Sequence, residues 1–141
     1  MSNRFQVARI EDIPSPVAPE PGAYEWKPIR HHFGVRAFGV NALVAHRAGD
    51  QVVEEHTEVQ EGCLRHEELY VVTHGRARFT IDGESVEAPA GTLIFVRDPQ
   101  TRRGATALED GTTVLAVGGE AGQAYRVSPW EAKYFVTPGG R

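Results

Sequence analysis

The pair Asp82-Gly83 constrains the fold of this sequence more than any other short motif. It lies between two segments in which apolar and polar residues alternate, 76–81 and 84–88. A two-residue type I′ turn needs positive φ at both central positions, and Asp-Gly is one of the pairs that adopt it readily. The sequence therefore predicts a β-hairpin with its turn at Asp82-Gly83.

Short apolar runs of the same kind continue on both sides of this hairpin. Gly, Asp or Pro separates the runs, which is typical of successive β-strands, and no long segment has the period of a helix. The expected strands are residues 35–46, 51–56, 69–73, 77–81, 85–88, 92–96, 104–107 and 113–117. The fold class is therefore all-β, either a closed barrel or a sandwich.

The two ends of the chain differ from this central part. Five prolines between residues 14 and 28 predict an extended arm or surface loop, because proline fixes φ and removes a backbone donor. Near the other end, Ser128-Pro129-Trp130-Glu131 predicts a short helix that begins with a capping box. We expect an arm and lead-in strand over residues 1–34, a barrel over 35–127, and a helix and tail over 128–141.

Composition excludes several classes of partner. The chain has 141 residues, which suits one domain, and its net charge of −4 offers no excess positive field for nucleic acid or anionic lipid. Cys63 is the one cysteine, so an internal disulfide is excluded and a reducing compartment is favoured. Without an apolar run long enough for a secretory signal or a membrane span, we expect a soluble, cytoplasmic protein.

The central segment, residues 49–104, resembles the cupin family of small β-barrels. Glu68-x6-Gly75 matches the end of the first cupin motif, Gly-x5-His-x-His-x3–4-Glu-x6-Gly, and Pro89-Ala90-Gly91-Thr92 after Asp82-Gly83 is also cupin-like. The resemblance is to small, single-domain bacterial cupins of the RmlC-like type. It implies a double-stranded β-helix or jelly-roll barrel that forms a homodimer. The family includes enzymes and non-catalytic binding proteins, so the fold alone does not identify an activity.

The metal-binding histidines of the cupin motifs are displaced or missing here. When the motif is aligned on Glu68, neither position of its His-x-His pair is a histidine in this sequence. When the motif is aligned on Gly49 instead, its first histidine position falls one residue before His56. We interpret this as a longer loop over residues 59–65, which costs little entropy at a surface. In the second motif, the His position falls on Arg102 in one register and Ile94 in the other.

A replacement metal cluster is one interpretation of the remaining residues. Strand alternation places His56 and Glu58 on one face, and His66 and Glu68 on one face if their strand begins at His66. Such a set of imidazoles and carboxylates suits a divalent metal such as Zn, Mn, Fe or Ni. In the alternative, His66 is a loop residue, His56 is partly exposed, and Glu68 pairs with an arginine without any metal.

Three further residues are candidates for binding a small-molecule ligand. Arg102 could pair with Glu68 or bind a carboxylate, or both Arg102 and Arg103 could face solvent. Tyr70 and Phe95 lie on expected strands and could form the wall of a pocket. Two functions stay open: a metal-dependent protein acting on a small polar molecule, and a metal-free cupin that binds a small acid or sugar.

Overall fold

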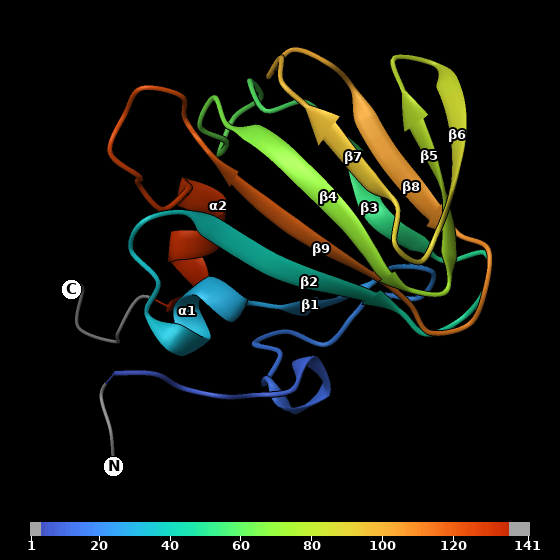
Figure 1. Ribbon diagram of the computed structural model, residues 1–141, viewed down its shortest axis with the longest axis horizontal. Helices are drawn as coiled ribbons and strands as arrows, with labels where there is room; N and C mark the ends of the chain where they lie inside the picture. The colour runs from blue at the N-terminus through green and yellow to red at the C-terminus, as the bar shows by residue number, and fades with distance from the viewer. Residues whose placement is uncertain (1–3, 136–141) are drawn as a thin grey trace.

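The computed structural model describes residues 4–135, which form nine strands and four short helical segments (Figure 1). The strands are β1 (Glu25–Lys27), β2 (Gly39–Ala45), β3 (Gln51–His56), β4 (Glu67–His74), β5 (Arg76–Ile81), β6 (Glu84–Pro89), β7 (Leu93–Val96), β8 (Arg103–Ala107) and β9 (Thr112–Gly119). The helical segments are η1 (Ile10–Asp12), α1 (Ile29–Phe33), α2 (Pro129–Ala132) and η2 (Lys133–Phe135).

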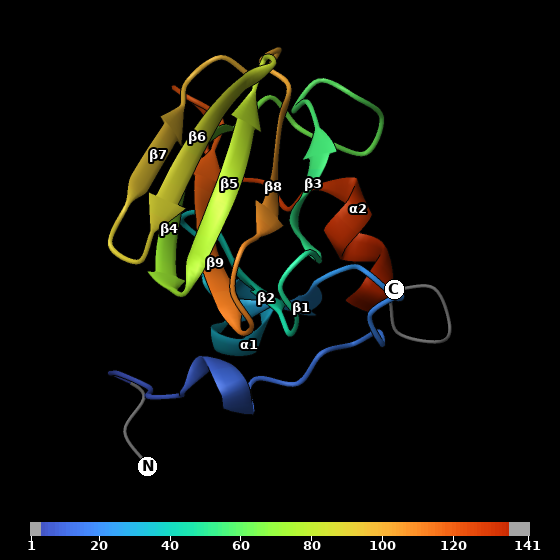
Figure 2. The same ribbon diagram turned by 90° about the vertical axis from the view of Figure 1, so that its right-hand side faces the viewer.

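The strands form two antiparallel sheets that face each other (Figures 1 and 2). One has the order β1-β2-β9-β4-β7 and the other the order β3-β8-β5-β6. The core fills the space between them and is made mostly of small and β-branched side chains with two aromatic rings, Tyr70 and Phe79. The predicted all-β class is confirmed.

The predicted hairpin is confirmed in its strands and in its turn. β5 and β6 pair from Arg76 with Pro89 to Ile81 with Glu84. Asp82 has φ 48° and Gly83 has φ 86°, the two positive angles that a type I′ turn requires.

All eight expected strands are present, but the first of them begins later than predicted. Residues 29–33 form α1, which ends at Gly34 in the left-handed conformation, and β2 begins only at Gly39. The lead-in strand expected within residues 1–34 is present as the three-residue strand β1, whereas α1 and η1 were not predicted. These elements are too short to show a period, and β1 is stabilised by its pairing with β2.

The proline-rich segment forms neither helix nor strand over residues 13–24, as its prolines predict. It lies against the body of the protein at several points. The amide of Gln51 donates to the Gly22 carbonyl, and the buried Lys27 ammonium donates to the Ile13 carbonyl at 2.9 Å. The arm is therefore attached to the edges of both sheets.

The C-terminal helix α2 begins at Pro129, as predicted, but the capping box is not formed. Ser128 makes no capping hydrogen bond with its side chain. Glu131 is instead buried and accepts a 2.7 Å hydrogen bond from Arg30. This ion pair with an arginine far away in the sequence takes the place of the local capping contact. Trp130 packs on Trp26 with ring centroids 5.3 Å apart, so α2 lies against β1, the edge strand of the five-stranded sheet. The predicted tail beyond residue 135 lies outside the described residues.

Among residues 4–135, no helix is long and apolar enough to cross a membrane.

Candidate functional site

The candidate site lies at one end of the barrel interior, called the mouth below, where three strands direct charged side chains inward. On β4, Tyr70 and Val72 are in the core, so alternation also turns Glu68 inward. On β8, the buried Ala105 and Ala107 place Arg103 on the same face. His56 ends β3 directly opposite Arg103.

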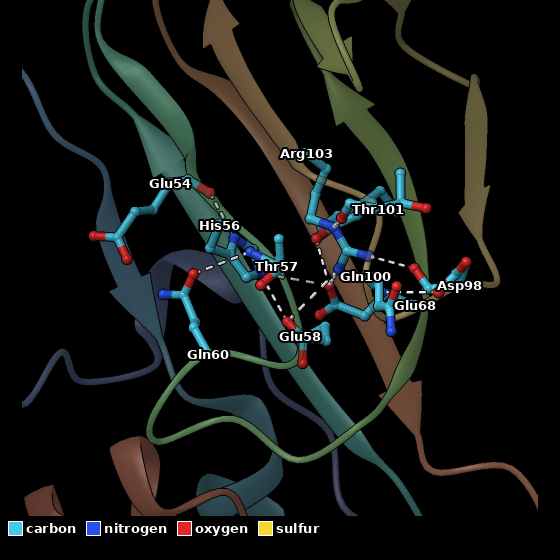
Figure 3. A network of polar contacts seen from close by, with 11 residues as sticks. Glu54, His56, Thr57, Glu58, Gln60, Glu68, Asp98, Gln100, Thr101 and Arg103 are labelled. Carbon is cyan, nitrogen blue, oxygen red and sulfur yellow. Dashed lines mark hydrogen bonds and ion pairs between the residues drawn. The ribbon is translucent and has the colours of Figure 1, made fainter.

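Arg103 is the centre of this cluster and its side chain is fully buried (Figure 3). Its Nη1 donates to Glu68 Oε1 at 2.9 Å and lies 3.7 Å from Glu58 Oε2. Its other nitrogens donate to backbone carbonyls, Nε to Thr101 at 2.9 Å and Nη2 to Asp98 at 3.3 Å. A buried guanidinium is costly unless its donors have acceptors, and here each of its nitrogens has one.

His56 is the second cation of the cluster. Its Nε2 lies 2.7 Å from Glu58 Oε2 and 3.8 Å from Glu68 Oε1, and its Nδ1 lies 2.6 Å from the Glu54 carbonyl oxygen. Burial acts to lower the pKa of His56, but the hydrogen bonds to Glu58 and Glu68 outweigh it and raise the pKa to about 10. With acceptors at both ring nitrogens, the imidazole is held in its doubly protonated form.

The two carboxylates respond differently to the same surroundings. Burial raises the pKa of Glu58 more than its contacts with His56 and Arg103 lower it. Burial acts in the same direction on Glu68, but hydrogen bonds from His56 and Tyr70 hold its pKa below the usual value. The Tyr70 hydroxyl donates to Glu68, and burial raises the pKa of that phenol well above normal. Two carboxylates thus face one imidazolium and one guanidinium, and the charges are matched.

His56, Glu58 and Glu68 could hold a metal ion, because each offers one ligand atom and these atoms lie within 4.8 Å of one another. The rest of the donor set opposes a metal. Arg103 places a positive charge between the two carboxylates, and Glu68 Oε1 already accepts from Arg103 and from Tyr70. A divalent ion beside the guanidinium would meet electrostatic repulsion in a site from which water is largely excluded. The residues therefore suit a charge-balanced cluster better than a metal centre.

His66 does not join the other three residues of the predicted cluster. It lies just before β4 begins, with its ring against Tyr125 at 5.6 Å between centroids. Burial lowers the pKa of His66, and its Nε2 has no hydrogen-bond partner among residues 4–135.

Arg102 is not the arginine that pairs with Glu68. Its side chain is 55% exposed and forms an ion pair with Glu55 at 3.3 Å. Motif counting reached Arg102 and therefore missed Arg103, one residue later. The alternative in which both arginines face solvent is also wrong, because Arg103 is buried. A usable signal was present: Arg103, Ala105 and Ala107 share strand parity, and the two alanines are small enough for a barrel interior.

The two aromatic candidates lie on opposite faces of their sheet. Tyr70 is 1% exposed and contacts Glu68 at the mouth. Phe95 is 47% exposed on the outer face, with the Arg97 guanidinium 4.8 Å above its ring, so it does not line the mouth.

Cys63 has a pKa raised to about 11, chiefly by burial, which leaves a neutral thiol unsuited to nucleophilic catalysis.

Comparison with solved structures shows which proteins have a similar fold. An RmlC-like cupin protein from Desulfovibrio desulfuricans aligns with a TM-score of 0.62 at 18% identity, covering 82% of this chain and 96% of that one. A cupin protein from Bacteroides fragilis has a TM-score of 0.58 at 22% identity, covering 79% of this chain and 88% of that one. A sugar phosphate isomerase of the cupin superfamily from Silicibacter pomeroyi has a TM-score of 0.56 at 17% identity, covering 70% of this chain and 60% of that one.

At these identities the likeness shows the fold alone. The chain has the cupin fold, as the resemblance in residues 49–104 implied, with two antiparallel sheets and a short C-terminal helix. No family model matches the sequence, and no curated protein matches it either.

Proposed function

We propose that this protein is a metal-free cupin that binds a small polar molecule at the mouth of its barrel. The observation that carries the proposal is the Arg103 side chain, which is fully buried and lies 2.9 Å from Glu68 and 3.7 Å from Glu58. It supplies, from within the chain, the positive charge that two inward carboxylates need. No metal ion is then required to balance them.

The mouth is partly exposed to solvent at its outer side. The side chains of His56 and Glu68 are each 16% exposed, whereas Arg103 behind them is fully buried. A ligand would therefore meet the His56 imidazolium next to the Glu68 carboxylate. Because both ring N–H groups of His56 already have acceptors, an acceptor group of the ligand would have to take the place of Glu58 or of the Glu54 carbonyl. That pairing suits a molecule with both donor and acceptor groups, such as a sugar or a small hydroxy acid.

Elemental analysis of untagged protein tests the metal-free part of the proposal. We expect no stoichiometric metal in the purified protein, and none retained after incubation with Mn, Fe, Ni or Zn followed by gel filtration. The variant Arg103→His removes the fixed charge and adds a ligand of the kind that metals prefer, so it is expected to retain metal where the natural chain does not. Arg102→His is the matched control, because Arg102 points to solvent. One metal per natural chain, lost in His56→Ala, would contradict the proposal.

A thermal-shift screen with neutral sugars and small hydroxy acids tests the binding part. A ligand that binds only the folded state raises Tm. We expect such a ligand to stabilise the natural chain and Arg102→Ala but not Glu58→Gln, whose carboxylate is part of the cluster. Equal shifts in all three proteins would place the binding site elsewhere. An absence of shifts with every compound would favour a role for the barrel as a scaffold.

The close spacing of His56, Glu58 and Glu68 favours a second candidate, a protein that depends on a divalent metal and acts on a small polar molecule. A metal held by one imidazole and two carboxylates would supply Lewis acidity at the mouth. The same elemental analysis separates the two candidates, because this one requires stoichiometric metal in the natural chain.

A further inference from the structure

A cavity lies outside the barrel, between the N-terminal segment and the five-stranded sheet. Its volume is about 570 Å³, which is within the range of small-molecule sites in proteins. Residues 8–11 form one wall, and in both views this segment runs beneath the sheets (Figures 1 and 2). The lining residue His74 ends β4, whereas Glu68 of the mouth is near the start of that strand, about 20 Å away. This cavity is therefore separate from the candidate site.

Strand pairing places the sheet side of the cavity in one row. Glu25 of β1 is paired with Val44 of β2. Val44 is paired in turn with Thr113 of β9, and Thr113 with His74 of β4. Directly paired residues in an antiparallel sheet point to the same face. Because Ala45, the neighbour of Val44, is in the core, this row is on the outer face of the sheet.

The two threonines that line the cavity have no hydroxyl proton left to donate. Thr73 Oγ1 donates to the Thr113 carbonyl at 3.3 Å, and Thr113 Oγ1 donates to the Gly111 carbonyl at 3.0 Å. A hydroxyl has one proton, and here a carbonyl of the chain accepts each of them. Both threonine oxygens can therefore only accept a further hydrogen bond.

The two histidines that line the cavity also offer acceptors. His74 Nδ1 lies 3.1 Å from the Gly111 carbonyl oxygen, and His46 Nε2 lies 2.8 Å from Glu25 Oε1. Hydrogen bonds, chiefly the one from Ser15, lower the pKa of Glu25 to about 2, so this carboxylate accepts and does not donate. The proton of each neutral ring is thus on the nitrogen that faces the oxygen. His74 Nε2 and His46 Nδ1 are left with lone pairs.

The cations that line the cavity are already paired. The buried Lys27 ammonium lies 2.9 Å from the Ile13 carbonyl, 3.3 Å from the Glu11 carbonyl and 3.2 Å from Glu25 Oε2. Three acceptors satisfy the three protons of an ammonium. Arg9 forms an ion pair with Glu11 at 3.3 Å. Two positive and two negative side chains therefore balance, and an anionic ligand would find no unpaired cation among them.

A metal ion does not fit this set of acceptors. Among residues 4–135, three ligand atoms from His, Cys, Asp or Glu lie within 4.8 Å of one another only at the mouth. The lining of the cavity also includes the apolar side chains of Ala8, Ile10 and Val44. A ligand that matches both features donates hydrogen bonds at one end and is a hydrocarbon at the other.

We propose that this cavity binds a small primary amine in its ammonium form. An ammonium has three N–H donors and no acceptor, which matches the nitrogens of His46 and His74 and the oxygens of the two threonines. Its charge strengthens each of these hydrogen bonds. The hydrocarbon chain of the amine lies on Val44 and Ile10 and loses its contact with water. This inference does not depend on the proposed function, because none of these residues is at the mouth.

An NMR titration of the ¹⁵N-labelled full chain with n-hexylamine tests the inference. We expect saturable shifts of the backbone amides that line the cavity, in residues 8–11, Val44, Thr113 and His74. A lack of saturable shifts, or shifts centred on the mouth, would overturn the proposal.

Two ligands with the same hydrocarbon chain identify what the cavity recognises. Hexyltrimethylammonium keeps the positive charge but has no N–H donor, and hexanoate carries a negative charge. Each is expected to bind at least about tenfold more weakly than n-hexylamine, because it cannot supply the hydrogen bonds of the ammonium. Equal binding of either ligand would overturn the proposal.

Substitutions of single acceptors test the site from the side of the protein. His74→Phe and Thr113→Val each remove an acceptor with little change in volume, so the Kd for n-hexylamine is expected to rise about tenfold in each. His32→Phe is the matched control and should leave the Kd unchanged, because His32 is exposed on α1 and is not part of this cavity. Far-UV circular dichroism checks that each variant is folded. An unchanged Kd in both His74→Phe and Thr113→Val would overturn the proposal.

Discussion

The two ends of the barrel interior are built from the same strands and stabilised in different ways. β4 places Val72 at the apolar end and Glu68 at the mouth, and β8 places Ala107 at the apolar end and Arg103 at the mouth. The apolar end depends on volume and close packing, whereas the mouth depends on matched charges that have lost most of their water. A fold can therefore keep its core and exchange the chemistry at its mouth by changing one or two residues per strand.

The largest expected effect is at the apolar core. Phe79 is fully buried on β5 and packs against Tyr70 at 5.6 Å between ring centroids. Phe79→Ala removes a ring from a close-packed site and is expected to lower the free energy of unfolding by about 3–5 kcal/mol. Urea denaturation measures it, with Thr80→Ala on the outward face as a control that should change little. A loss below about 1 kcal/mol would mean that the interior is not packed as described.

At the mouth, the largest expected effect follows removal of the guanidinium. Arg103→Met leaves Glu58 and Glu68 without their buried cation, and we expect a loss of about 2–4 kcal/mol in the free energy of unfolding at neutral pH. Because the loss comes from uncompensated negative charge, adding Glu68→Gln to Arg103→Met should recover part of it. If the double variant is less stable than Arg103→Met, the cluster is not held together by charge matching.

The pH dependence of stability tests His56. Its pKa in the folded protein, about 10, is above the unfolded value of 6.5, so its contribution is complete below pH 6.5 and is lost as pH rises toward 10. We expect the free energy of unfolding to fall by up to about 2 kcal/mol between about pH 7 and pH 9. The difference in stability between the natural chain and His56→Gln, measured across this range, should shrink as pH rises. A constant difference would show that the imidazole is not held protonated.

The smallest expected effect is at the neighbouring arginine. Arg102 forms an exposed ion pair with Glu55, and such pairs contribute little in water. Arg102→Ala should therefore change the free energy of unfolding by less than about 0.5 kcal/mol. A loss of stability as large as that expected for Arg103→Met would contradict the placement of Arg102 in solvent and Arg103 in the interior.

Local signals were enough to predict most of the fold. Asp82-Gly83 determines one hairpin by backbone geometry alone, and short apolar runs separated by Gly, Asp or Pro mark the longer strands. β1 and α1 have no such signal, because three to five residues are too few to show a period. Their structure depends on partners elsewhere in the chain, which single-sequence patterns do not contain.

The site was only partly predictable for a related reason. His56, Glu58 and Glu68 meet as the sequence suggested, but simple alternation does not explain why His56 faces inward. Pairing of β3 with β8 shifts register between Gln51 and Val53 and again between Val53 and His56. β-Bulges of this kind redirect the following side chains, and they leave no clear mark in a sequence. The sequence left open whether His66 belongs to β4, and it lies in the loop before that strand. Arg103 was missed because it is the first residue of β8, where an error of one residue reverses the face.

The order of strands in the larger sheet also has a consequence for how the chain acquires its structure during synthesis. β9, the central strand of that sheet, is the last strand in the sequence, and it pairs with β2 so that Asn41 lies opposite Ala116. β2 and β4 are therefore without their shared neighbour until residues 112–119 have left the ribosome. A topology dominated by such distant pairings folds slowly, and until β9 arrives the apolar runs of β4 and β7 are exposed to other nascent chains.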